Sequence, residues 1–162
     1  KPPSARQTAL AHYFAAERTS LCDLFPLGRF ELQFHRPFTV EGIPDWAPDN
    51  TSVVCRLTSD NGCRTITVAL IPVRAKPLID RDIANARATG TISSVAGIGD
   101  QAWYYSQHAA DGSSVEEAGG NHLWTVIGSQ GITVTVSGFG DPATADRIVA
   151  RLVLDPHGEA GT

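Results

Sequence analysis

The chain of 162 residues lacks methionine, and only two of its 13 basic residues are lysines, Lys1 and Lys76. Because translation starts on methionine, we expect the start of the gene product to lie upstream of Lys1. A signal peptide or a membrane anchor, if the gene encodes one, would lie in that upstream segment. The arginine-dominated basic set, with much alanine and glycine, is typical of a GC-rich bacterial genome.

Basic runs and long apolar stretches are also missing. The arginines are scattered from Arg6 to Arg151, and the formal net charge is −4. Nucleic-acid binding needs clustered cations, so we expect no nucleic-acid partner. No apolar stretch reaches the roughly 18 residues of a membrane span. We therefore expect membrane association only through an anchor upstream of Lys1.

Recognisable catalytic, metal and cofactor motifs are absent as well. No two histidines have the His-x-x-x-His spacing of a helical metal site, and no cysteine adjoins a histidine; the histidines are His12, His35, His108, His122 and His157. Ser129 in Gly-Ser-Gln-Gly does not match a nucleophile elbow. The glycines of 97–100 lack the third glycine of a dinucleotide loop. We predict no catalytic residue, no metal and no cofactor.

Three cysteines are present, Cys22, Cys55 and Cys63. In a processed bacterial chain they favour an oxidising, exported location. Segments 53–57 and 65–70 flank Asn61-Gly62, the strongest two-residue hairpin turn signal. That turn places Cys55 opposite Val68, so Cys55 and Cys63 would not be partners.

We therefore favour a Cys22–Cys55 bridge, which ties the N-terminal region to the sheet. A loop of this size stabilises by roughly 3–4 kcal/mol in the chain-entropy model. A longer loop centred on Ser59 would instead bring Cys55 to Cys63. Three free, buried thiols are a further alternative, since free cysteine is commonly buried.

The N-terminal half of the chain predicts a helix over 5–18, from apolar residues at helical spacing. Alternation at 30–34 predicts a half-buried strand, with a short helix near 24–30 as the alternative. The Pro-rich segment 37–50, which holds Trp46, predicts a surface loop. Pro77 predicts a helix start, with Ile79 and Ile83 on its buried stripe and Gly90 at its end.

The C-terminal half predicts a bend at 97–100, a strand at 101–105 and a long loop over 107–121. A hairpin joins 123–127 to 132–137, because the second run alternates apolar and hydroxyl residues. Asp141 then caps a helix with Pro142 at its first position. Consecutive strands with short turns indicate an antiparallel sheet. We predict an α+β fold of five to seven strands with two or three helices packed on one face.

We assign 1–156 to a single domain and 157–162 to a C-terminal tail. Within the domain, Trp103 and Tyr105 would share one face of their strand, and Ala102 and Tyr104 the other. If helices leave the first face open, its rings mark a binding surface that Trp124 and Trp46 could join. The alternative is that both faces are covered.

Four stretches occur in an order that resembles a family of secreted actinobacterial lipoproteins: Leu21-Cys22-Asp23-Leu24-Phe25, Val54-Cys55-Arg56-Leu57, 97–104 and the terminal hairpin with its Asp141-Pro142 helix. The resemblance covers about Leu21 to Leu154. It implies an α+β sandwich similar to mycobacterial cell-envelope lipoproteins and to extracellular sensor domains of Ser/Thr kinases. It also supports pairing Cys22 with Cys55, and it implies no particular activity. Cys63 and the longer N-terminal helix depart from the family pattern.

We expect a non-enzymatic extracytoplasmic protein, secreted or lipid-anchored, that binds a small molecule, a cell-wall component or a protein. The alternative is the extracellular sensor domain of a membrane signalling protein. A second alternative is a small hydrolase or cyclase with a pocket between sheet and helices. A deep cavity that holds a titratable pair, such as His122 with a carboxylate, would favour that enzyme, and a shallow, dry core would count against it.

Overall fold

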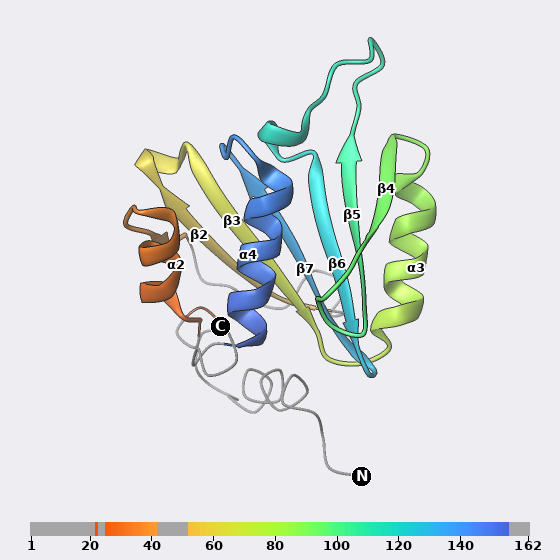
Figure 1. The fold of residues 1–162 in the computed structure, drawn as a ribbon, viewed down its shortest axis with the longest axis horizontal. Helices are drawn as coiled ribbons and strands as arrows, with labels where there is room; N and C mark the ends of the chain where they lie inside the picture. The colour runs from red at the N-terminus through yellow and green to blue at the C-terminus, as the bar shows by residue number, and fades with distance from the viewer. Residues whose placement is uncertain (1–21, 23–24, 42–51, 156–162) are drawn as a thin grey trace.

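A computed structural model describes residues 22, 25–41 and 52–155, and within them three α-helices accompany one seven-stranded sheet (Figure 1). The strands are β1 (Thr39–Val40), β2 (Val53–Ser59), β3 (Arg64–Ile71), β4 (Gly90–Val95), β5 (Gln101–Gln107), β6 (Asn121–Ile127) and β7 (Gln130–Ser137). The helices are α2 (Leu27–Phe34), α3 (Ala75–Ala86) and α4 (Pro142–Leu154), with short 3₁₀ turns η2 (Asp60–Gly62) and η3 (Glu116–Ala118).

All neighbouring strands in the sheet are antiparallel, in the order β1-β2-β3-β7-β6-β5-β4. The predicted α+β class and antiparallel sheet are therefore confirmed. The sheet consists of the β2–β3 hairpin and a meander from β4 to β7, joined where β3 pairs with β7. Helix α3 carries the chain from β3 near the centre to β4 at the far edge.

The β2–β3 hairpin has the predicted register, with Cys55 opposite Val68. Asn61 and Gly62 have positive φ angles of 56° and 87°, which is the backbone that made this dipeptide a turn signal. The hairpin therefore keeps Cys63 away from Cys55.

The segment predicted as a strand at 30–34 is instead the end of helix α2, so that prediction was wrong and the helical alternative was the right kind of element. Leu27, Phe30 and Phe34 recur at helical spacing and pack toward the core. Phe30 is fully buried, whereas Leu32 is 76% exposed, the reverse of what a strand with both on one face would require.

Two edge strands were not predicted. β4 has the sequence Gly-Thr-Ile-Ser-Ser-Val, which carries little apolar alternation, and β1 has only two residues inside the predicted 37–50 loop. The predicted helix over 5–18, most of that loop, and the tail 157–162 lie outside the described residues.

One face of the sheet packs against α2 and α4, which lie in front of the strands in Figure 1. The core here is built from alternate residues such as Leu123, Val134 and Val149. Asp141 caps α4 as predicted, since its carboxylate accepts from the Thr144 backbone N–H at 3.2 Å.

Helix α3 packs on the opposite face, so the prediction that helices cover one face holds for α2 and α4 only. Its Ile79 and Ile83 pack with Tyr105, Trp124 and other residues on that face. The helix approaches closely at Gly131, where an added Cβ would lie 2.9 Å from the Ala75 Cβ. A helix that connects β3 to β4 must cross the sheet, and α4 already covers the other face.

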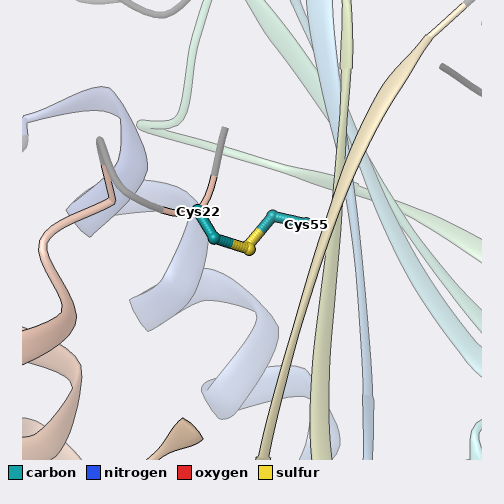
Figure 2. The surroundings of a disulfide bond; sticks show 2 residues. All are labelled: Cys22 and Cys55. Atoms are coloured by element: carbon teal, nitrogen blue, oxygen red, sulfur yellow. A yellow bond between two sulfur atoms is a disulfide. The ribbon is translucent and has the colours of Figure 1, made fainter. Parts of the chain in front are cut away.

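The Cys22–Cys55 disulfide is present, with its Cα atoms 5.3 Å apart (Figure 2). Both cysteines are buried in the core under α4, and Cys63 is free and exposed. The bridge joins the segment before α2 to strand β2, as the sequence predicted. A structural disulfide of this kind is consistent with an oxidising compartment.

Candidate functional site

A cleft of about 440 Å³ lies between α3 and the sheet, and we call it the α3 cleft. Its lining comes from α3 and the residues after it and from strands β5, β6 and β7: Asp82, Asn85, Ala86, Thr89, Tyr105, Gln107, His122, Trp124, Thr133 and Thr135. The volume falls within the roughly 300–1,000 Å³ of small-molecule pockets. The lining is more polar than that of most such pockets, which consist mainly of hydrophobic and aromatic side chains.

Three rings form the floor of the α3 cleft. Tyr105 stacks on His122, with ring centroids 5.7 Å apart and planes 14° apart. His122 contacts Trp124 with centroids 5.5 Å apart. The register explains the grouping, because Tyr105 and His122 are cross-strand partners and Trp124 lies two residues after His122 on the same face.

Two side-chain hydrogen bonds fix the floor. The Tyr105 hydroxyl lies 2.5 Å from the Thr89 hydroxyl, at the end of α3. The His122 Nδ1 lies 2.5 Å from the Thr135 hydroxyl on β7. The imidazole is therefore oriented by its neighbouring strand, and the described residues provide no hydrogen-bond partner for its Nε2.

Burial lowers the pKa of His122 below its usual range, and the Asp82 carboxylate on α3 only partly opposes this effect. His122 is therefore neutral at pH 7, with one ring nitrogen that donates and one that accepts. A neutral imidazole in a cleft serves as a hydrogen-bonding group or as a general base.

Several polar side chains in the cleft walls form no hydrogen bond with the rest of the described chain. Asn85 on α3, Gln107 on β5 and Thr133 on β7 form no side-chain hydrogen bond within the part of the chain that the structure describes. Asp82 has an ion pair with Arg81 at 3.6 Å, on the exposed side of the helix. The amide groups of Asn85 and Gln107 and the Thr133 hydroxyl are free to contact a bound molecule.

The aromatic residues predicted as a binding surface divide into three cases. Tyr105 and Trp124 lie together in the cleft floor, but only 4% and 3% exposed, because α3 covers them. Trp103 pairs with Trp124 across the strands yet lies outside the cleft lining, with the Lys76 ammonium 5.5 Å from its ring centroid. Trp46 lies outside the described residues. The rings therefore form a recessed floor rather than an exposed surface.

Sequence reasoning missed Asp82, Asn85, Gln107, Thr133 and Thr135 as cleft residues. Asp82 and Asn85 lie on the helix predicted to start at Pro77, outside its predicted buried stripe, and Gln107 was assigned to a loop. The available signal was alternation, since Thr133 and Thr135 share one face of their strand. His122 was named in combination with a carboxylate, and Asp82 lines the same cleft, but no hydrogen bond or ion pair joins these two side chains.

A second titratable cluster lies on the α4 side of the sheet. The Tyr104 hydroxyl donates to the Glu116 carboxylate at 2.8 Å, and Asp146 of α4 is fully buried beside them. Neither Asp146 oxygen has a hydrogen-bond partner. Because Tyr104 and Asp146 are buried and Glu116 is half-buried, we expect this cluster to affect stability.

Within residues 22, 25–41 and 52–155, no group of three or more His, Cys, Asp or Glu side chains could hold a metal ion. None of the helices described there is long and apolar enough to cross a membrane. The chain matches no family model, and neither the curated proteins nor the solved structures include a significantly similar one.

Proposed function

We propose that this protein is a non-enzymatic extracytoplasmic binding domain that holds a small molecule or part of a cell-envelope component in the α3 cleft. The observation that carries the proposal is the cleft itself. Hydrogen bonds hold two rings of its floor, and polar side chains in its walls have no hydrogen-bond partner among the described residues. The Cys22–Cys55 disulfide supports a location in an oxidising compartment. The resemblance to secreted actinobacterial lipoproteins supports secretion or lipid anchoring.

The arrangement suits binding because the floor is rigid before a ligand arrives. Tyr105 and His122 are each held by a hydrogen bond from a neighbouring element. A pre-organised site loses little side-chain entropy when it binds. The polar groups of Asn85 and Gln107 then provide specificity at the walls.

A blocking variant tests the proposal. We expect fragments from a library of cations, anions, polyols and aromatic rings to shift amide NMR signals of 82–89 and of the cleft strands. Asn85→Trp fills the cleft and should abolish these shifts. Ala84→Trp is the matched control, because Ala84 is exposed on α3 and does not line the cleft. If no fragment shifts the cleft signals, the proposal is wrong.

A second candidate is a small hydrolase or cyclase, favoured by one observation, the presence of His122 and Asp82 at the same cleft. A neutral imidazole is the form required of a general base. The test is hydrolysis of activated esters and phosphodiesters by the parent protein and by His122→Gln. A saturable activity that His122→Gln abolishes would establish the enzyme, and no activity in either protein would exclude this candidate.

The third expectation, a sensor domain of a membrane signalling protein, differs from the first in what precedes Lys1. A lipobox cysteine in the gene would support an anchored binding protein. A transmembrane helix would support the sensor.

A further inference from the structure

The α3 cleft adjoins a row of threonines on the same sheet face. Thr135 lines the cleft on β7 and pairs with Thr67 on β3, which pairs in turn with Arg56 on β2. Thr133 and Thr65 flank this row on the same face. All four threonines are half-buried. Among the described helices, α3 alone packs on this face, with contacts concentrated on β4, β6 and β7.

The charge of this surface disfavours anions. No lysine or arginine lines the α3 cleft, and its single charged group is the Asp82 carboxylate. Arg56, at the far end of the threonine row, pairs with Glu41 at 3.1 Å. A phosphate or carboxylate ligand would therefore find no cation in the cleft lining, and Arg81, beside the cleft, is already paired with Asp82 at 3.6 Å.

The same surface is poorly built for a cationic ligand. Ammonium groups bind over open aromatic ring faces. Tyr105 and Trp124 are almost fully buried, and His122 lies against both of them. Only the Asp82 carboxylate remains for a cation, at the helix wall.

Neutral groups that both donate and accept hydrogen bonds make up the rest of the surface. The amides of Asn85 and Gln107, the neutral imidazole of His122 and the threonine hydroxyls all have this property. A molecule with many hydroxyls has the matching property, because each hydroxyl donates one hydrogen bond and accepts others.

We propose that the α3 cleft and the Thr135–Thr67 row bind a neutral, polyhydroxylated chain, an oligosaccharide of more than one ring. One ring occupies the cleft beside Asn85, Gln107 and His122, and the next lies along the hydroxyls of Thr135 and Thr67. This inference rests on the proposed binding function and names its ligand class.

The experiment uses three probes of similar length and different charge. These are chitotetraose, its fully de-N-acetylated cationic form, and anionic tetragalacturonate. We expect chitotetraose to shift the Trp124 indole signal and the His122 ring signals, and to bind at least about tenfold more tightly than either charged probe. Equal or tighter binding of a charged probe would overturn the inference.

Two variants separate the cleft from the threonine row. Gln107→Ala should weaken chitotetraose and N-acetylglucosamine alike, by about fivefold to tenfold for a lost hydrogen bond. Thr67→Val should weaken only the tetramer, by a similar factor. Gln101→Ala and Thr91→Val are the matched controls, because neither side chain lines the cleft. Equal effects of Thr67→Val on both sugars, or none, would contradict binding along the row.

The outcome distinguishes an error in the ligand class from an error in the binding function. If library fragments bind in the cleft but chitotetraose does not, the ligand class is wrong and the binding function stands. If neither binds there, both fail.

Discussion

Asp146 is an ionisable side chain in a place that does not suit a charge. It lies in α4, fully buried, and its oxygens have no hydrogen-bond partner. Burial, with a further contribution from the Glu116 carboxylate, raises its pKa well above the usual range. The Tyr104 hydroxyl, which could have donated to it, donates to Glu116 instead. The carboxyl of Asp146 is therefore more stable when protonated.

This placement predicts a pH-dependent stability. An aspartate in the unfolded chain titrates near pH 3.9, so the contribution of Asp146 to the free energy of unfolding is most favourable below that pH. Stability then declines as the pH rises toward the higher folded pKa. Asp146→Asn removes the ionisable group. At pH 7 we expect this variant to unfold at a higher urea concentration than the parent, with a free energy of unfolding greater by about 1–3 kcal/mol.

At pH 4 the difference between Asp146→Asn and the parent should shrink, because the carboxyl is protonated in the folded protein and about half protonated in the unfolded chain, so unfolding gains little from ionisation. Asp80→Asn serves as the control, because Asp80 is exposed and ion-paired with Lys76 at 2.6 Å. An equal difference at pH 4 and pH 7 would show that the charge is not the cause.

At the residue scale, the sequence predicted the alternation on strands better than the site. It placed Trp103 and Tyr105 on one face, and that face is the one with the cleft. It could not reveal that Asp82 and Asn85 border the same cleft. Helical spacing predicts which residues of α3 face solvent. Only the angle at which α3 crosses the sheet decides which of those residues lie beside a strand.

At the scale of single elements, Gly131 controls how closely α3 lies on the sheet. A Cβ there would be 2.7 Å from the Thr125 carbonyl oxygen and 2.9 Å from the Ala75 Cβ. We expect Gly131→Ala to displace the start of α3, to cost about 1–3 kcal/mol, and to weaken binding in the α3 cleft. Urea unfolding and fragment titration measure the two effects.

Gly28→Ala is the matched control for that prediction. Gly28 lies in α2, and a Cβ there meets nothing within 4 Å. Alanine should be neutral or stabilising there, by up to about 1 kcal/mol, because of its higher helix propensity. A Gly131→Ala protein as stable as Gly28→Ala, with unchanged binding, would show that α3 tolerates the extra methyl group.

The wrong prediction of a strand at 30–34 arose from the spacing of the apolar residues in α2. Phe30, Leu32 and Phe34 alternate like a strand, while Leu27, Phe30 and Phe34 recur like a helix. The two patterns share Phe30 and Phe34 and differ only at Leu32 and Leu27. Packing decides between them, since Phe30 and Phe34 contact Phe25 and Phe139 while Leu32 faces solvent.

At the scale of the whole molecule, the Cys22–Cys55 bridge closes a loop across 33 residues. We expect its reduction to lower the free energy of unfolding by about 3–4 kcal/mol in the chain-entropy model. Thermal unfolding with and without dithiothreitol measures the effect. Cys63→Ser should unfold like the parent and show the same loss on reduction, because Cys63 is free and exposed. No change in the parent on reduction would contradict the prediction.

Hairpins and helix starts could be predicted from the sequence because their signals are local. The Asn61-Gly62 turn and the Asp141-Pro142 start are examples. The order of strands could not be predicted to the same extent. Pairing of β3 with β7 has no local signal, and β4 has too few apolar residues to be recognised without its partner β5.

The β3–β7 pairing also has a consequence for how the chain acquires its structure. The two central strands, at 64–71 and 130–137, come from well-separated parts of the polypeptide. The sheet therefore cannot close until the penultimate element has been synthesised, and such distant pairings make folding slow. Until residues 130–137 have been synthesised, one edge of β3 has no partner strand, and an unpaired edge of this kind is prone to aggregate.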